Sequence, residues 1–246
     1  MSKTIILIPS RMSATRLPGK PLLKINDLAI ISHVVNKAKK TNLGQVVVCT
    51  EDKAIFDEVE KNGGQAILTN NNHKTGTDRI FDGLKRLKVK DVDFVLNLQG
   101  DEPAINEDDI ISLNNLMIKN DNDIGTLASE IKDQSTYLNK DIVKVVTKEK
   151  LKNDNFSLAL NFMRKKEHQE SQNIYHHIGI YIFKVNILEK FVNLPQSKNE
   201  IKNNLEQLRA LDNNLKINVG LAKSSPIGID TEEDYVAIKK IMEYKS

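Results

Sequence analysis

Short apolar runs alternate with helical segments through the N-terminal part of the chain, and this alternation is the strongest constraint on the fold. The runs are residues 4–8, 45–49, 65–68 and 93–98. The segments between them carry apolar residues at helical spacing, and one of them stops at the glycine pair Gly63-Gly64. Strands that alternate with helices in this way form βαβ units. The sequence therefore predicts an α/β fold with a mostly parallel sheet that helices flank.

The alternation of strands and helices ends near Gly125, where strand-like runs follow one another without full helices between them. These runs are residues 125–131, 143–147, 156–160 and 178–183, with a loop at Tyr175-His176-His177. A charged amphipathic helix at 199–211, a strand at 216–221 and a helix at 231–244 complete the chain, and Thr231 is the expected N-cap of that last helix. Because there is no repeat or linker, the sequence predicts one domain over 1–246 with a smaller β-rich insertion.

The composition is that of a globular chain of 246 residues, with 39% hydrophobic and 28% charged residues. A net charge of +3 with mixed signs is too small for a dedicated nucleic-acid surface. The single cysteine, Cys49, excludes a disulfide framework. No apolar stretch approaches the roughly 20 residues of a membrane span, and the short apolar run after Lys3 is no signal peptide. We therefore expect a cytoplasmic protein that binds neither nucleic acid nor membranes.

A cationic loop follows the first apolar run directly. Pro9 ends the strand because it has no N–H group to donate, and Arg11, Arg16 and Lys20 follow within a few residues, the last after a Leu-Pro-Gly turn. Ligands of open α/β sheets bind at the carboxyl ends of the strands. Fixed cations and free backbone N–H groups at that edge suit a polyphosphate. The alternative interpretation is a solvated basic loop.

The common nucleotide motifs are absent from this loop. A P-loop needs glycine five positions before Gly19 and a hydroxyl residue after the lysine, but those positions hold Ala14 and Pro21. No Gly-x-Gly-x-x-Gly sequence follows the first strand either, which disfavours a dinucleotide cofactor. The loop therefore predicts a phosphate site of another kind.

Two aspartates are candidates for a metal site. Asp101 lies just past the fourth predicted strand, in Gln99-Gly100-Asp101, where catalytic groups of α/β proteins are found. Asp230 precedes the last predicted helix. Mg²⁺ takes oxygen ligands and needs few protein carboxylates when it sits on a triphosphate. The alternatives are a turn aspartate at position 101 and helix capping at position 230.

Several motifs, in the same order along nearly the whole chain, resemble the 3-deoxy-manno-octulosonate cytidylyltransferase family of sugar-acid cytidylyltransferases. They are residues 8–22, 73–79, 98–103, 175–181, 205–211 and 228–234. The resemblance implies a Rossmann-like, mostly parallel but mixed sheet of the nucleotide-diphospho-sugar transferase type. It also implies transfer of CMP from CTP to the anomeric hydroxyl of 3-deoxy-D-manno-octulosonate (Kdo) for lipopolysaccharide biosynthesis. Mg²⁺ and a homodimer are further expectations, with about 125–200 forming the sugar-acid and dimer-side subregion.

The resemblance also implies roles for individual residues. The expected catalytic residues are Arg11, Lys20, Asp101 and Asp230, and the last two would hold the metal ion. The expected nucleotide-binding residues are Arg11, Ser13, Arg16, Lys20, Thr77, Arg79 and Gln99. The expected sugar-acid-binding residues are Gln99, Arg164, His177, Tyr181, Glu206 and Gln207. Two alternatives to ligand binding are purely structural: a salt bridge of Arg79, and an i,i+3 ion pair between Glu206 and Arg209.

One departure from the family pattern concerns the acceptor. Members usually carry Phe-Ser-Arg, whereas this chain has Met163 in place of the serine before Arg164. A cytidylyltransferase for another acid sugar, such as 8-amino-Kdo or a sialic-acid-like nonulosonate, is therefore one alternative. A non-catalytic nucleotide-binding relative is the other, but the presence of Lys20 and Asp101 disfavours it.

Overall fold

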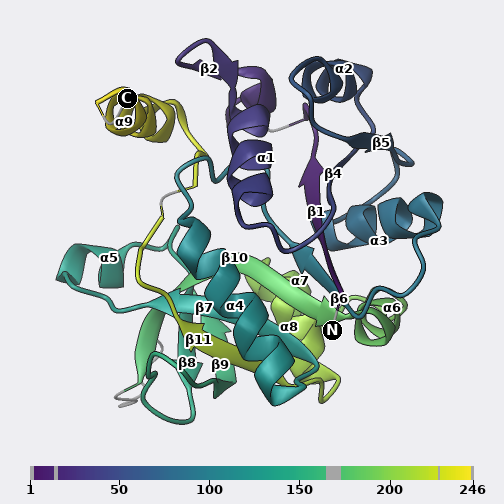
Figure 1. The fold of residues 1–246 in the computed structure, drawn as a ribbon. Helices are drawn as coiled ribbons and strands as arrows, with labels where there is room; N and C mark the ends of the chain where they lie inside the picture. The colour runs from purple at the N-terminus through teal and green to yellow at the C-terminus, as the bar shows by residue number, and fades with distance from the viewer. Residues whose placement is uncertain (1–2, 14–15, 165–172, 227, 245–246) are drawn as a thin grey trace. The chain divides into compact units, whose positions relative to one another are not determined.

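The chain consists of two compact units in a computed structural model that describes residues 3–13, 16–164, 173–226 and 228–244 (Figure 1). Unit 1 contains Met1–Ile110 and Pro226–Ser246, and unit 2 contains Ile111–Ser225. The subregion predicted at about 125–200 lies within unit 2, while the single domain over 1–246 stays a prediction. Ala14 of the cationic loop lies outside the described residues.

Unit 1 is built on four parallel strands in the order β5-β4-β1-β6. They are β1 (Thr4–Ser10), β4 (Val46–Thr50), β5 (Ala66–Leu68) and β6 (Phe94–Asn97). Every residue of β1, β4 and β6 is buried, as expected for parallel strands covered on both faces. β1 lies between β4 and β6, so the strand order reverses there and the loops after β1 and β6 diverge. This switch point is where ligands of such sheets bind.

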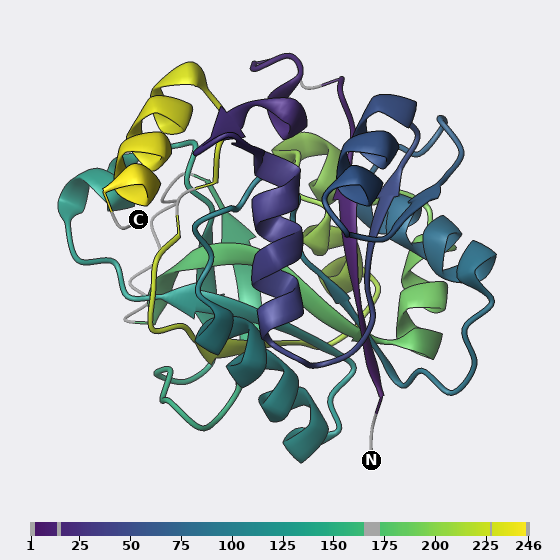
Figure 2. The same ribbon diagram turned by 45° about the horizontal axis from the view of Figure 1, so that its top comes forward.

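Helices α1, α2 and α3 cover this sheet. They are α1 (Ile30–Lys40), α2 (Lys53–Lys61) and α3 (Gly76–Leu87), and Figure 2 shows α1 running beside β1. α3 packs so closely on β4 that a Cβ on Gly83 would lie 2.3 Å from Cys49 Sγ, so only glycine fits there. Within the described residues, no helix combines the length and the apolar character that crossing a membrane requires.

The C-terminal segment returns to unit 1 and packs near the cationic loop. After the 3₁₀ turn η1 (Lys20–Leu22) come the short strands β2 (Lys24–Ile25) and β3 (Leu28–Ala29), and the chain ends with α9 (Glu232–Glu243). Leu17, Ile25, Ile30, Ile229 and Ile238 form one buried cluster. Thr231 caps α9 in a capping box with Asp234, which confirms the predicted N-cap. Burial of Ile229 thereby fixes the position of the residue that follows it.

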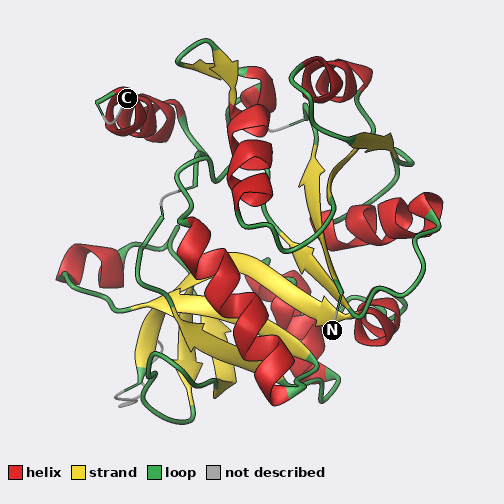
Figure 3. Cartoon of the chain, in the orientation of Figure 1, coloured by secondary structure: helices red, strands yellow, loops and turns green. Residues whose placement is uncertain are grey.

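Among the described residues of unit 2, five strands close on themselves, and β10, β7, β11, β9 and β8 each pair with two of the others (Figure 3). They are β7 (Ile124–Ser129), β8 (Lys144–Thr147), β9 (Ser157–Met163), β10 (Ile174–Lys184) and β11 (Ile217–Leu221). The helices are α4 (Glu107–Asn120), which begins in unit 1, α5 (Gln134–Leu138), α6 (Val185–Val192), α7 (Lys198–Asn203) and α8 (Gln207–Asp212). The predicted α/β class with a mixed sheet is confirmed.

Two local predictions in unit 2 were wrong. Residues 175–177 belong to β10 rather than to a loop, because Tyr175 and His177 alternate into the interior and pair with neighbouring strands. The single helix predicted at 199–211 is two helices, because Asn204 adopts a left-handed conformation with φ 52° and ends α7.

A buried ion pair joins α7 to α8. The Arg209 guanidinium donates from Nε to Glu200 Oε2 at 2.8 Å and from Nη2 to Glu200 Oε1 at 2.5 Å, and their side chains are 3% and 4% exposed. Glu200 also closes a capping box with Ser197. Burial by itself raises the pKa of Glu200, but the hydrogen bonds from Arg209 outweigh it and lower the pKa. Glu200, rather than Glu206, is therefore the main partner of Arg209.

We predict that Glu200→Gln lowers the free energy of unfolding by about 3–5 kcal/mol, because it leaves the Arg209 charge buried without a carboxylate. Adding Arg209→Met should recover part of the loss. The control is Glu243→Gln, which removes a half-exposed pair with Lys239 at 3.8 Å and should cost under about 1 kcal/mol. Urea unfolding at neutral pH measures all three variants. Equal small effects of Glu200→Gln and Glu243→Gln would contradict the prediction.

Candidate active site

A cleft of about 350 Å³ lies at the carboxyl ends of β1 and β6 in unit 1. It brings together eight of the residues predicted from the sequence. These are Arg11, Ser13, Arg16, Lys20, Arg79, Gln99, Asp101 and Asp230. Thr77 is buried behind it and accepts a hydrogen bond from Asn97 Nδ2 at 3.4 Å. The cleft therefore lies at the switch point of the parallel strands, with residues from the start, the middle and the end of the chain.

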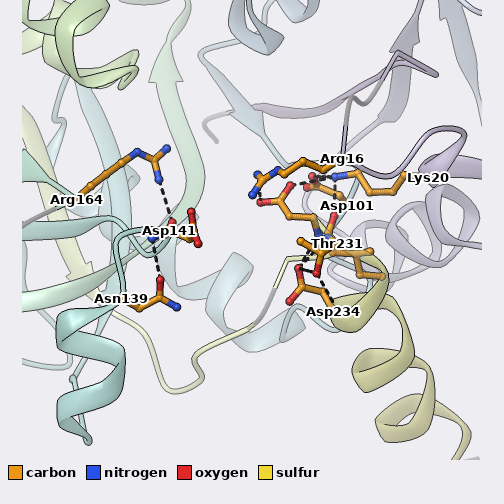
Figure 4. Close-up of polar contacts among 10 residues, drawn as sticks. Arg16, Lys20, Asp101, Asn139, Asp141, Arg164, Thr231 and Asp234 are labelled. Carbon is orange, nitrogen blue, oxygen red and sulfur yellow. Dashed lines mark hydrogen bonds and ion pairs between the residues drawn. The ribbon is translucent and has the colours of Figure 1, made fainter.

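The Lys20 ammonium lies at the centre of a charged cluster in this cleft (Figure 4). Lys20 Nζ donates to Asp101 Oδ2 at 2.7 Å, to Asp230 Oδ1 at 3.3 Å and to the Ile229 carbonyl at 2.5 Å. Arg16 forms an ion pair with the other oxygen of Asp230 at 2.9 Å. The Lys20 side chain is 11% exposed, whereas Arg16 is 55% exposed. Two cations and two carboxylates thus neutralise one another within the cluster.

Local backbone geometry places Lys20 in this position. Gly19 has φ 72°, a conformation that favours glycine, and Pro21 follows the lysine inside η1. On the other side, the Ile229 N–H group donates to the Asp101 carbonyl at 2.9 Å. That bond ties the C-terminal return to the turn after β6. Asp101 and Asp230 therefore reach the same ammonium although they are far apart in the sequence.

The two aspartates fit a metal ion that is also bound by phosphate. Their carboxylate oxygens converge on one cation, the Lys20 ammonium. In the part of the chain that the structure describes, no group of three or more His, Cys, Asp or Glu side chains could form a complete metal cage. Mg²⁺ does not need one, because it is commonly held by one or two carboxylates together with substrate phosphates and water.

Glu102 lies beside this pair and was given no role from the sequence. Its side chain is buried, and Oε2 has no hydrogen-bond partner among the described residues. Burial raises the pKa of Glu102 to about 8, and the charges of Asp101 and Asp230 contribute to the rise. Glu102 is therefore mostly protonated at neutral pH, which limits the negative charge next to the two aspartates.

The nucleotide-side residues of α3 are held by partners that sequence reasoning missed. Arg79 is buried and donates to Thr69 Oγ1 at 3.0 Å, and it forms an ion pair with Glu51. The salt-bridge alternative for Arg79 is therefore present in the structure. Asp52, next to Glu51, accepts a hydrogen bond from the Met12 N–H group at 2.8 Å and so fixes the cationic loop. Both acids directly follow β4, so the carboxyl-end rule that identified Asp101 could have found them.

A second support lies under the His73 loop. Asp82 accepts hydrogen bonds from His73 Nε2 at 2.9 Å, from the Asn70 N–H group at 2.8 Å and from Arg86 Nε at 2.7 Å. Burial by itself raises the pKa of Asp82, but the bonds from Arg86, Asn70 and His73 lower it to about 2. Since His73 lines the cleft, this network orders one of its walls. Gln99 lines another wall and donates to Asn97 Oδ1 at 3.3 Å.

The predicted sugar-acid residues lie in unit 2, where an irregularity in β10 brings two of them together. The register of β10 against β7 shifts between Ile178 and Tyr181, so His177 and Tyr181 both face inward with ring centroids 5.4 Å apart. The Thr126 hydroxyl donates its hydrogen to the Ile180 carbonyl at 2.7 Å. Its Oγ1 atom also lies 3.0 Å from His177 Nε2, and toward that nitrogen it can only accept. His177 Nε2 therefore carries a hydrogen and donates to Thr126 Oγ1.

Tyr181 presents a buried hydroxyl that has no hydrogen-bond partner within 3.5 Å among the described residues. Burial raises the pKa of Tyr181 well above its ordinary value, and the nearby charge of Glu206 adds to the rise. Glu206 precedes α8, which Gln207 begins, and its Oε1 lies 3.8 Å from Arg209 Nη2. The predicted Glu206–Arg209 ion pair is thus present but long. An unsatisfied buried hydroxyl next to a carboxylate suits a ligand with several hydroxyl groups.

β9 ends at Met163, and Arg164 follows it directly. Met163 is buried with 8% exposure, so the departure from the family serine lies in the interior of unit 2. Arg164 is partly exposed and donates from Nη1 to the Asp141 carbonyl at 3.0 Å (Figure 4). Its guanidinium forms no ion pair with any residue that the structure describes.

A polyphosphate-sized cleft at the switch point of a parallel sheet, with cations opposite paired carboxylates, defines the site of a nucleotidyltransferase. A sequence model of the family described as Cytidylyltransferase matches residues 5–217. The chain belongs to the cytidylyltransferase family. Cytidylyltransferases generally use a divalent metal ion.

Several curated relatives that match the chain over nearly its full length share one name. A 3-deoxy-manno-octulosonate cytidylyltransferase of Thermodesulfovibrio yellowstonii is 42% identical over 97% of this chain and 98% of its own length. One from Rhodopseudomonas palustris is 39% identical over 98% of each chain. A solved structure of CMP:2-keto-3-deoxy-manno-octonic acid synthetase complexed with CTP is 31% identical, with a TM-score of 0.89 over 100% of both chains. A UTP-bound UGPase from Acinetobacter baumannii shares the fold, with a TM-score of 0.71 at 11% identity.

Burial of His177 makes the stability of the protein depend on pH. Burial, with a smaller contribution from the charge of His176, lowers the pKa of His177 from 6.5 to about 3. Between these values the unfolded chain binds a proton that the folded protein does not. The contribution of His177 to stability is therefore complete above pH 6.5 and is lost as the pH falls toward 3.

We predict that the difference in unfolding free energy between the wild type and His177→Gln shrinks by up to about 1.4 kcal/mol per pH unit below 6.5. Glutamine keeps a donor for Thr126 but does not titrate. Denaturant unfolding of both proteins at pH 7.5, 6 and 5 measures the difference. A constant difference across this range would show that His177 is not held neutral.

Proposed function

We propose that this protein transfers CMP from CTP to the anomeric hydroxyl of 3-deoxy-D-manno-octulosonate, giving CMP-Kdo and pyrophosphate for lipopolysaccharide biosynthesis. The observation that carries the proposal is the cluster of Lys20, Arg16, Asp101 and Asp230 in the cleft of unit 1. The high identity to named 3-deoxy-manno-octulosonate cytidylyltransferases supports the choice of nucleotide and acceptor.

The reaction forms a bond from the anomeric oxygen to the α-phosphorus of CTP and breaks the bond from that phosphorus to the bridging oxygen. Pyrophosphate leaves with the bridging oxygen. Little covalent chemistry falls to the protein, so positioning and charge stabilisation supply the rate. Arg11, Arg16 and Lys20 hold the triphosphate and stabilise the charge of the leaving group. Lys20 and Arg16 pair with Asp101 and Asp230, so binding a triphosphate would exchange one set of anionic partners for another.

Asp101 and Asp230 would hold Mg²⁺, whose ligands are otherwise phosphate oxygens and water. When bound, this ion neutralises charge at the α-phosphate and lowers the pKa of the attacking hydroxyl. Movement of the Lys20 ammonium to the triphosphate frees both carboxylates for this role. Ser13, Thr77, Arg79 and Gln99 are proposed to complete the nucleotide site, Thr77 and Arg79 by fixing the start of α3.

His177, Tyr181, Glu206, Gln207 and Gln99 are proposed to bind the hydroxyl groups of the sugar acid. The buried Tyr181 hydroxyl supports this assignment, because its hydrogen-bonding capacity is what a hydroxyl-rich ligand would use. Arg164 would bind the acceptor carboxylate, for which a guanidinium is the most specific partner. A homodimer and a cytoplasmic location belong to the same proposal and rest on the family relationship.

The experiment that tests the function measures pyrophosphate release from CTP and Mg²⁺ with a panel of acceptors. The panel contains 3-deoxy-manno-octulosonate, its 8-amino analogue and N-acetylneuraminate. We predict the highest kcat/KM for the first, because Arg164 and the residues proposed to bind its hydroxyl groups are all present in this chain. A preference of tenfold or more for either competitor, which is about 1.4 kcal/mol, would overturn the acceptor assignment. Absence of release with every acceptor would overturn the function.

We predict that Asp101→Asn and Asp230→Asn each lower kcat by about 10²–10³, the loss typical of one preorganised electrostatic contact. Both variants should fold normally, because each aspartate is partly exposed. Asp57→Asn is the matched control, since Asp57 pairs with Lys53 on the surface of α2. Mn²⁺ binding in the presence of CTP, followed by paramagnetic relaxation, should weaken in the two active-site variants alone. Wild-type turnover in either variant at saturating Mg²⁺ would remove that residue from the metal site.

A further inference from the structure

Unit 2 contains a fully buried lysine to which the sequence motifs assign no role. Lys144 begins β8, and its side chain is 2% exposed. Its ammonium donates to three backbone carbonyls: Ile142 at 2.9 Å, Arg164 at 3.0 Å and Asn139. Among the described residues it forms no ion pair with a carboxylate. A buried ammonium is costly unless every donor is satisfied, so these carbonyls must stay in place around it.

The carbonyls that bind Lys144 belong to the segments that hold Arg164. Two of them come from the turn at residues 139–142 that follows α5, and the third is the carbonyl of Arg164 itself. The same turn provides the Asp141 carbonyl that accepts from Arg164 Nη1, and Figure 4 shows the guanidinium directed at it. The Asp141 N–H group donates to Asn139 Oδ1 at 2.8 Å, which keeps the turn closed. Lys144 thus fixes both the backbone of Arg164 and the acceptor for its side chain.

Strand register supports this arrangement. Lys144 lies opposite Met163 on β9 and opposite His176 on β10. Residues paired in this way project from the same face of the sheet. The buried, apolar Met163 is therefore a suitable neighbour for the apolar stem of Lys144, whereas the residue after it carries the guanidinium.

The two cations also act together electrostatically. Burial lowers the pKa of Lys144, and the charge of Arg164 lowers it further, so the two groups lie close enough to repel each other. Carbonyl dipoles satisfy the hydrogen bonds of Lys144, but no carboxylate in the part of the chain that the structure describes pairs with its charge. An anion at the Arg164 guanidinium would relieve this repulsion. The pair therefore favours a ligand carboxylate at Arg164 over a neutral group.

We infer that Lys144 is a positioning residue for the acceptor: it holds the turn at 139–142 and the Arg164 backbone so that the Arg164 guanidinium meets the carboxylate of the sugar acid. This inference rests on the proposed function, since it takes Arg164 as the residue that binds that carboxylate. Lys144 itself does not contact the substrate. Its removal should weaken acceptor binding and leave CTP binding unchanged.

The test measures kcat and KM separately for 3-deoxy-manno-octulosonate and for CTP in Lys144→Met, Arg164→Ala and the double variant. We expect Lys144→Met to raise the KM for the sugar acid about tenfold or more, because small misplacement of a positioning group has effects of this size. The KM for CTP should change less than about twofold. In the Arg164→Ala background, Lys144→Met should add less than about a further twofold, because the two residues act as one unit.

Lys184→Met is the matched control, because Lys184 Nζ also binds a backbone carbonyl in unit 2, that of Asp121 at 2.8 Å. It should leave both KM values unchanged. Circular dichroism and thermal melting check folding of every variant. If Lys144→Met does not fold, Lys144→Gln, which keeps an amide donor, is measured in the same way and the same outcomes apply.

The outcomes separate this inference from the proposed function. If Arg164→Ala raises the KM for the sugar acid but Lys144→Met does not, Lys144 has no positioning role and the proposed function is unaffected. An equal effect of Lys144→Met with and without Arg164 would also overturn the inference, since Lys144 would then act independently. If Arg164→Ala itself leaves that KM unchanged while turnover persists, both the Arg164 assignment and this inference fail. Wild-type protein without transferase activity would overturn the function.

Discussion

The ammonium of Lys20 joins three segments that are far apart in the sequence. It donates to Asp101 after β6, and to Ile229 and Asp230 in the C-terminal return. A mostly buried ammonium without these partners would cost several kcal/mol, so the contacts and the closed arrangement of the cleft depend on each other. Because burial holds Glu102 largely protonated at neutral pH, Asp101 and Asp230 carry the negative charge that compensates this ammonium.

The buried cations Arg209 and Lys144 of unit 2 have partners of different kinds. Arg209 pairs with a carboxylate, Glu200, and the pair joins two short helices that would be unstable alone. Lys144 is instead surrounded by carbonyl oxygens. The first arrangement is electrically neutral, and the second leaves positive charge beside Arg164. The same fold therefore contains one purely structural ion pair and one cationic region that suits an acidic ligand.

Predictions from the sequence were most accurate where they rested on a local pattern, such as the periodicity of a strand or the capping of a helix end. The predicted strands of unit 1 and the Thr231 cap are confirmed, because periodicity and capping are local. The helix predicted at 199–211 failed because apolar spacing does not detect one left-handed residue, Asn204. Glu51 and Asp52 were overlooked although they follow β4 as Asp101 follows β6, because no family motif drew attention to them.

The sequence by itself determined the α/β class, the cationic loop after the first strand and the chemical groups that a nucleotide and a metal ion require. The tertiary structure decided which of these groups meet. Burial of Ile229 brings Asp230 to Lys20, a register shift in β10 puts His177 beside Tyr181, and Lys144 reaches the carbonyl of Arg164 across β8 and β9. These contacts depend on packing and strand register between segments that are distant in the sequence, and no local periodicity of the sequence encodes them.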